Sequence, residues 1–119
     1  MIRKFYLLLG VLCFLSCEEL IEVEDISDEN ISILAPANNT TLDGSAVSFS
    51  WEPLEHAESY HLQIARPEFN NAQVIVEDTM ITATNFIKDL EAASYQWRVR
   101  AINFNYQTQY TTLNLTIEE

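Results

Sequence analysis

Few residues in this chain have the type and spacing that catalysis requires. The only histidines are His56 and His61, and their spacing matches no metal-ligand motif. Gly10 and Gly44 are the only glycines, so neither a phosphate-binding glycine loop nor a nucleophile elbow is present. Carboxylates are abundant, but glycosidase chemistry needs two of them held across a cleft, which a single small domain rarely provides. We therefore predict a protein that is not an enzyme and that has no catalytic residue, metal or cofactor.

Arginines at positions 98 and 100 could bind a ligand or could stabilise the fold. Strict alternation from Tyr95 onward places apolar residues on one face of a predicted strand and Arg98 and Arg100 on the other. Tyr110 and Thr112 should face the same way from the neighbouring strand. A tyrosine ring can stack on a guanidinium group, a cation–π contact worth about 0.5 to 1 kcal/mol when exposed. We therefore interpret Arg98, Arg100 and Tyr110 as structural residues, with ligand binding as the alternative.

The segment after this strand carries aromatic and amide side chains that suit binding. Phe104, Asn105, Tyr106 and Gln107 follow the end of the strand, and binding residues concentrate in loops. Aromatic rings beside amides could stack on a sugar ring or start a protein contact. We take these four residues as the candidate binding loop. The alternative is that one aromatic ring covers the end of the domain and the other has no role.

The N-terminal residues have the layout of a secretory signal peptide. Arg3 and Lys4 precede an apolar run at residues 5–15, and the small residue Ser16 precedes Cys17. A helix of about eleven residues rises only about 16 Å, roughly half of a hydrocarbon core, so a transmembrane span is not expected. We predict that residues 1–16 direct export and are then removed.

Residues 14–17, Phe-Leu-Ser-Cys, resemble a bacterial lipobox, although Phe14 and Leu15 depart from its commonest pattern. In lipoproteins the signal peptidase cuts before a cysteine that carries a diacylglyceryl thioether. The resemblance implies that Cys17 is a lipid anchor with palmitate-type acyl chains and that the protein is attached to the cell outer membrane. Cys13 would leave with the signal peptide, so no disulfide and no cysteine-based metal site could form. The alternative is an ordinary signal peptide followed by an incidental cysteine.

An acidic stretch at residues 17–29 follows. Dense like charge repels itself and stays extended, so we predict a solvated tether between the lipid and the domain. The stretch resembles the acidic signals that direct some Gram-negative lipoproteins to the cell surface, and a plain spacer is the alternative. Asp25, Asp28 and Glu29 do not predict a calcium site, because no glycine turn or regular ligand spacing accompanies them.

The charge balance narrows the range of partners. Removal of Arg3 and Lys4 leaves four basic residues against eighteen acidic ones, a net charge of about −14. Nucleic acid is therefore not expected as a partner, because phosphate binding needs clustered Lys and Arg. Adhesion to anionic lipid surfaces is disfavoured for the same reason.

Residues 30–119 read as one domain built of short strands. Alternating apolar and polar residues predict strands at residues 31–34, 47–51, 60–65, 74–76, 81–87, 95–103 and 109–117. Residues 37–44 are rich in turn formers and are predicted to be a loop. Seven short strands with no sustained helical periodicity predict an all-β sandwich.

Motifs spread over residues 31–117 are similar to those of bacterial fibronectin type III domains. They are Val47-x-Phe49-x-Trp51-x-Pro53, Ala57-x-x-Tyr60-x-Leu62-Gln63-Ile64-Ala65, Phe69, and Leu90-x-x-x-x-Tyr95-x-Trp97-Arg98-Val99-Arg100-Ala101-x-Asn103. The resemblance implies a seven-stranded immunoglobulin-like sandwich whose central layers contain Trp51, Tyr60, Leu62, Trp97, Val99 and Leu113, with Phe69 under a loop. Tyr95, five residues after Leu90, also fits a tyrosine corner. The family often has a glycine where Tyr106 stands and a tryptophan where Tyr110 stands.

Two non-catalytic functions remain. In the first, the domain of an outer-membrane-anchored lipoprotein binds an unidentified envelope protein or supports an envelope assembly. In the second, the protein is a glycan-binding accessory lipoprotein of a polysaccharide-uptake system, resembling the N-terminal domains of starch-utilisation-type outer-membrane binding proteins. Those proteins usually carry further carbohydrate-binding domains, and only one domain is predicted here. We therefore favour the first function.

Overall fold

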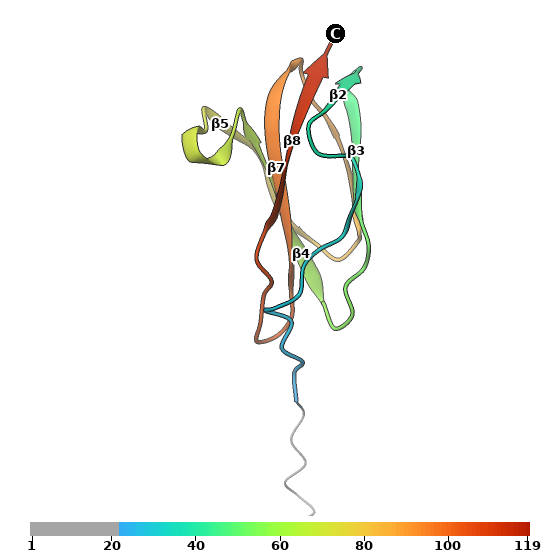
Figure 1. Ribbon diagram of the computed structural model, residues 1–119, viewed down its shortest axis with the longest axis vertical. Helices are drawn as coiled ribbons and strands as arrows, with labels where there is room; N and C mark the ends of the chain where they lie inside the picture. The colour runs from blue at the N-terminus through green and yellow to red at the C-terminus, as the bar shows by residue number, and fades with distance from the viewer. Residues whose placement is uncertain (1–21) are drawn as a thin grey trace, which may run out of the picture.

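Apolar residues at every second position form the strands that carry the core. The computed structural model of the protein describes residues 22–119 (Figure 1). The predicted signal peptide and Cys17 lie outside the described residues. Alternate side chains are buried along β3 (Ala46–Trp51), β4 (Ser59–Arg66), β7 (Ala93–Ile102) and β8 (Thr111–Glu118). Because successive side chains of a strand point to opposite faces, each of these strands has one apolar and one polar face.

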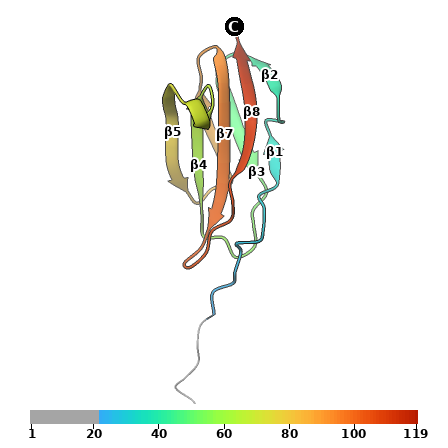
Figure 2. The same ribbon diagram turned by 60° about the vertical axis from the view of Figure 1, so that its left-hand side comes forward.

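Two sheets enclose the core. The remaining elements are β1 (Ile33–Ala35), β2 (Thr40–Asp43), β5 (Val74–Ile81), β6 (Asn85–Asp89) and a short 3₁₀ helix, η1 (Phe69–Asn71). One sheet has the order β1-β3-β6 and the other the order β2-β8-β7-β4-β5. Neighbouring strands are antiparallel except β2 and β8, which are parallel. Figures 1 and 2 show the two sheets face to face, and the predicted all-β immunoglobulin-like sandwich is confirmed.

Aromatic rings fill the space between the sheets. The residues predicted for the central layers are all buried: Trp51, Tyr60, Leu62, Trp97, Val99 and Leu113. Phe49 meets Trp97 edge to face with ring centroids 4.8 Å apart, and Trp51 meets Tyr60 in the same way at 5.6 Å. Such edge-to-face pairs add about 0.5 to 1.5 kcal/mol each to the stabilisation that comes from burial.

Two tyrosine hydroxyl groups fasten loops to this core. The Tyr95 hydroxyl donates to the backbone carbonyl of Glu91 at 2.6 Å, four residues earlier, which is the predicted tyrosine corner. The Tyr60 hydroxyl accepts a hydrogen bond from the backbone N–H of Leu54 at 3.0 Å and so holds the connection between β3 and β4. Both rings are buried, so each hydroxyl reaches the backbone from inside the sandwich.

A strand that the sequence did not predict, β2, follows β1 and belongs to the other sheet. β1 pairs with β3, whereas β2 pairs with β8, so residues 22–119 contain eight strands and not the predicted seven. Pro36 lies between the two segments and has no N–H to continue the first pairing. The prediction of a loop over residues 37–44 is wrong at residues 40–43, because the edge of β8 supplies hydrogen-bond partners that the local sequence does not reveal.

Part of the predicted tether is packed against the sandwich. Ile26 is only 2% exposed and belongs to the core cluster. The carbonyl of Glu24 accepts a hydrogen bond from the side chain of Asn103 at 2.8 Å, and the N–H of Glu29 closes a turn onto the carbonyl of Ile26. The prediction that residues 17–29 are solvated throughout is therefore wrong at Ile26, where burial of an apolar side chain outweighs repulsion between its charged neighbours.

Candidate functional site

The outward face of the five-stranded sheet carries a stack of aromatic and cationic side chains. Trp97 and Val99 point into the core, so the same strand, β7, directs Arg98 and Arg100 outward. The guanidinium carbons of Arg98 and Arg100 lie 4.3 Å and 4.5 Å from the ring centroid of Tyr110, and Arg98 also lies 4.0 Å from the ring of Phe69. The predicted stacking of Tyr110 on these arginines is confirmed. We call Phe69, Arg98, Tyr110 and Arg100 the arginine ladder.

Hydrogen bonds fix the ladder to the strands beneath it. The Nε group of Arg98 donates to Gln63 Oε1 on β4 at 2.8 Å. The backbone N–H of Phe69, in η1, donates to Gln96 Oε1 on β7 at 3.0 Å. Phe69 itself belongs to the connection between β4 and β5, and its ring contacts Arg98 on the outward face of the sheet. β4, the neighbouring helix η1 and the distant strand β7 therefore hold the ladder in place.

A hydrogen-bond network centred on the imidazole of His61 borders the arginine ladder, and it could not be predicted from the sequence. Nε2 of His61 lies 2.5 Å from Asp78 Oδ1, and Nδ1 of His61 lies 2.6 Å from the hydroxyl of Tyr110. The His61 hydrogen bond, followed by a smaller one from Gln63, lowers the pKa of the Asp78 carboxyl below its ordinary value. Only the pairing of β4 with β5 brings residues 61 and 78 together, so no spacing rule within the sequence could reveal them.

The residues of this network are suited to holding one another in place and not to nucleophilic catalysis. A carboxylate, an imidazole and a hydroxyl in that order also occur in hydrolases, where the hydroxyl oxygen is the free nucleophile. Here the hydroxyl belongs to Tyr110, whose ring lies against two guanidinium groups. His61 is 16% exposed at its side chain. Among residues 22–119, no group of three or more His, Cys, Asp or Glu side chains is arranged to hold a metal ion.

The candidate binding loop is held from within by Asn103. The Asn103 side chain is 7% exposed and accepts hydrogen bonds from the N–H groups of Asn105 and Tyr106 at 3.2 Å and 2.9 Å. Tyr106 is half-buried and packs against the core, so only part of its ring faces solvent. Phe104, in contrast, is 82% exposed. Within this loop, the Tyr106 ring therefore helps to cover the end of the sandwich, whereas the Phe104 ring lies in solvent.

A hollow lies beside Phe104 at the N-terminal pole of the sandwich. Its volume is about 660 Å³ and it is lined by Glu22, Val23, Glu24, His56, Glu58, Asn103 and Phe104. His56 is in the loop between β3 and β4, with its Nε2 atom 3.7 Å from Glu55 Oε1. The hollow therefore combines an exposed ring, carboxylates and one imidazole.

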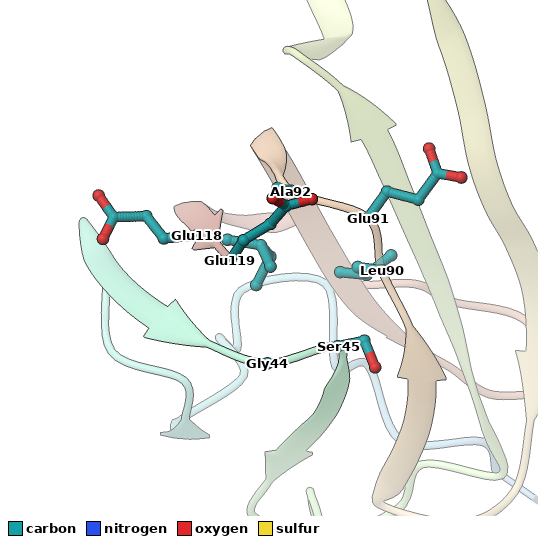
Figure 3. A pocket seen from close by; sticks show the side chains of 8 residues that line it. Gly44, Ser45, Leu90, Glu91, Ala92, Glu118 and Glu119 are labelled. Atoms are coloured by element: carbon teal, nitrogen blue, oxygen red, sulfur yellow. The ribbon is translucent and has the colours of Figure 1, made fainter.

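The opposite pole has a second hollow, of about 520 Å³, beneath the tyrosine corner (Figure 3). It is lined by Gly44, Ser45, Leu90, Glu91, Ala92, Ile117, Glu118 and Glu119. Figure 3 shows the carboxyl groups of Glu91 and Glu118 pointing away from each other. These carboxylates do not converge on a common point, so they do not form the facing pair that glycoside hydrolysis requires.

Apolar side chains are exposed on β5 and β6, the last strands of their sheets. Val74 and Ile75 are each 47% exposed, Met80 is 54% exposed and Ile87 is 69% exposed. Among residues 22–119, β5 pairs only with β4, so its outer edge presents backbone groups that no other described strand pairs with (Figure 2). Between the two sheets, Lys88 of β6 forms an ion pair with Glu77 of β5 at 3.2 Å. Inward-pointing charges of this kind limit non-specific edge pairing.

Comparisons with known proteins identify the fold through similarity to solved structures. No protein-family model and no curated protein matches the chain. Among solved structures, it is similar to a fibronectin type III domain of the human collagen alpha-1(XX) chain, with 12% identity, a TM-score of 0.58 and coverage of 78% of this chain and 90% of that one. It is also similar to fibronectin(III)-like modules of Clostridium thermocellum CbhA, with 6% identity, a TM-score of 0.55 and coverage of 75% and 96%.

A third similar structure, named FN3tt, has 12% identity and a TM-score of 0.55, and the match covers 82% of this chain and 98% of that one. Within residues 22–119, no helix is long and apolar enough to cross a membrane. At these identities the likeness concerns the backbone, and many unrelated functions share this sandwich. The chain contains a fibronectin type III-like β-sandwich domain.

Proposed function

We propose that the protein is a lipoprotein of the bacterial cell envelope, attached to the outer membrane through Cys17, and that its sandwich is a non-catalytic module that binds another envelope protein. The observation that carries the proposal is the exposure of apolar side chains on the free edge strand β5. Val74, Ile75 and Met80 lie on a strand whose outer backbone groups have no neighbouring strand in the part of the chain that the structure describes. An extended segment of a partner can add to such an edge, with main-chain hydrogen bonds and side-chain pockets contributing together.

Site-specific crosslinking tests the binding surface. A photoreactive residue at position 80 of β5, where Met80 is 54% exposed, should crosslink one partner in intact outer membranes. The yield should fall at least about tenfold in Ile75→Lys, because the charge opposes burial of this strand. Leu34→Lys is the matched control, since Leu34 is 60% exposed on β1, in the other sheet. Equal yields in the two variants would contradict the proposal.

The lipid anchor is tested separately at Cys17. Labelled palmitate should be incorporated into the wild-type chain and not into Cys17→Ser. That variant should also keep residues 1–16 and migrate as a larger chain, because the peptidase cuts before a cysteine that carries lipid. Unlabelled wild-type protein would contradict the anchor and leave the binding surface to its own test.

Glycan binding is the second candidate function, and Phe104 is the residue that favours it. Its ring is 82% exposed and borders the hollow at the N-terminal pole. An aromatic face beside carboxylates and an amide can stack on a sugar ring and accept its hydroxyl hydrogen bonds. A glycan array should then show a signal that Phe104→Ala removes and that Leu34→Ala retains. An array without any signal would exclude this second function.

A further inference from the structure

We infer that the arginine ladder forms a binding site for one carboxylate group, and that the protein partner proposed above supplies it from an Asp or Glu side chain. The observation behind this inference is a charge imbalance. Residues 22–119 contain four Lys and Arg residues, two of which are paired with carboxylates. Arg66 pairs with Glu91 at 3.4 Å, and Lys88 pairs with Glu77 at 3.2 Å. Within the same residues, neither Arg98 nor Arg100 forms an ion pair, although the chain is strongly acidic.

The stacking prepares both guanidinium groups for an anion. A guanidinium group has five N–H donors in its plane, so stacking against a ring leaves these donors directed to the side. Among the guanidinium donors of Arg98 and Arg100, only the Nε–H group of Arg98 has an acceptor within residues 22–119, and this acceptor is Gln63 Oε1. The Nε group of Arg100 is enclosed and has no acceptor, which leaves its terminal nitrogens as the donors that a ligand can reach. Because the Tyr110 ring fixes both planes, little side-chain entropy remains to be lost on binding.

The surroundings favour a single carboxylate over a polyanion. Asp78 is hydrogen-bonded to His61, and although the charge of Arg98 contributes to the lowered pKa of this carboxyl, the two side chains form no ion pair. The negative charge of the rest of the molecule repels a chain of closely spaced anionic groups, whereas one carboxylate is attracted by the two nearby cations. Arginine can bind a carboxylate with two parallel hydrogen bonds, which adds direction to the charge attraction.

The position of the ladder connects it to the β5 edge. Arg100 is opposite His61 in the sheet, and His61 is opposite Met80. Strands in a sheet are about 4.8 Å apart, so Met80 and Arg100 lie about 10 Å apart on the same face. A segment that contacts the exposed Met80 can therefore extend an acidic side chain to the ladder. We expect the partner to combine apolar residues with one Asp or Glu, and this part of the inference rests on the proposed function.

The site itself can be tested without the partner. The arginine Nε–H signals of the ¹⁵N-labelled full chain are recorded by NMR while N-acetylglutamate α-amide, a single side-chain carboxylate, is added at constant ionic strength. The signals of Arg98 and Arg100 should shift and reach saturation, whereas those of Arg66 should not. N-acetylglutamine amide, which has the same shape without the charge, should cause no shift. Shifts that rise linearly and equally for all three arginines would overturn the inference.

Variants of Arg100 and Arg66 test which arginines bind the carboxylate. Arg100→Gln should weaken binding at least about tenfold, since a charge-assisted hydrogen bond contributes roughly 1.5 to 3 kcal/mol. Arg66→Gln is the matched control and should bind as the wild type does. Arg100→Lys should bind with intermediate strength, because it keeps the charge and loses the planar fork.

Methyl glucuronide distinguishes an acidic sugar from an acidic side chain. Saturable shifts with this sugar and none with the glutamate derivative would overturn the assignment of the carboxylate to a protein. Failure of the β5 crosslinking experiment would contradict the proposed function and leave these titrations unaffected, so the two failures can be told apart.

Discussion

The hydroxyl oxygen of Tyr110 lies 2.6 Å from Nδ1 of His61 while the ring of the same residue stacks on two arginines. One side chain therefore joins an imidazole on β4 to two guanidinium groups on β7. Its hydroxyl and its ring make separable contributions, because the first acts through a hydrogen bond and the second through its π electrons.

Two substitutions at Tyr110 should separate these contributions. Tyr110→Phe keeps the ring and should lower the free energy of unfolding by about 1 kcal/mol, the usual value of one hydrogen bond. Tyr110→Leu also removes two cation–π contacts and should cost about 2 to 3 kcal/mol in total. Urea unfolding of both variants measures the difference. Identical midpoints for the two variants would show that stacking contributes nothing to stability.

Removal of the Tyr95 hydroxyl should destabilise the domain. Tyr95→Phe leaves the backbone carbonyl of Glu91 without its donor, and an unsatisfied group of this kind costs about 1 to 3 kcal/mol. The ring remains in the core, so the change isolates the hydroxyl. Chemical denaturation gives the value, and a midpoint equal to that of the wild type would refute the tyrosine corner as a stabilising feature.

The same residue should make the domain sensitive to high pH. Burial raises the pKa of the Tyr95 phenol above its ordinary value of 10.0. The unfolded chain then loses this proton at lower pH than the folded one, so the stabilisation is complete below about pH 10 and is lost as the pH rises through the folded pKa. Unfolding midpoints between pH 8 and 11 should fall more steeply for the wild type than for Tyr95→Phe. Parallel curves would contradict this prediction.

Low pH should destabilise the domain through protonation of the Asp78 carboxylate. The hydrogen bond from His61 lowers the pKa of this carboxyl below 3.8, so its contribution to stability is present above that pH and is lost as the pH falls through the folded pKa. Asp78→Asn should therefore unfold with a shallower pH dependence below about pH 4. A direct NMR titration of the carboxyl carbon provides the check, and a midpoint at or above the ordinary value would disprove the prediction.

Ile26 should be as important to the fold as a residue of the sandwich proper. Truncation of a buried isoleucine to alanine typically costs about 2 to 5 kcal/mol, and Ile26 is 2% exposed. Leu34→Ala removes an apolar side chain that is 60% exposed, and it should change stability by no more than about 0.5 kcal/mol. If both variants unfold at the same denaturant concentration, residues 22–29 are not part of the folded unit.

The core strands were predictable because each one encodes its two faces locally. In β3, β4, β7 and β8, apolar and polar residues alternate over most of the region that pairs, and in β4 the alternation is broken only at the register shift between Ile64 and Ala65. β2 has four residues between turn formers, and its partner β8 is far away in the chain, so its strand character comes from the pairing. β5 was predicted too short because Glu77 breaks the apolar pattern, and only the structure shows that Lys88 balances its charge.

Some contacts of the candidate site could also be predicted from the sequence, whereas others could not. Stacking of Tyr110 on Arg98 and Arg100 could be predicted, because alternation along neighbouring strands places these side chains on one face. The contact between His61 and Asp78 depends on the register of β4 against β5, which short-range spacing does not encode. Ile26 lies in a run of acidic residues, and its local sequence does not distinguish it from the other apolar residues nearby. Its burial could not be predicted, because it depends on how the side chain packs against the folded sandwich.

The parallel pairing of β2 with β8 also determines how the domain responds to mechanical load. Thr40 is paired with Leu115 and Asp43 with Glu118, and Figure 1 shows the blue N-terminal part of the described chain and the C-terminus at opposite poles. A pull between these poles draws the two strands past each other along their length. All hydrogen bonds between them then bear the force together, so they shear as a group and do not open one after another. Stretching the domain from its ends should therefore require far more force than peeling β5 from β4.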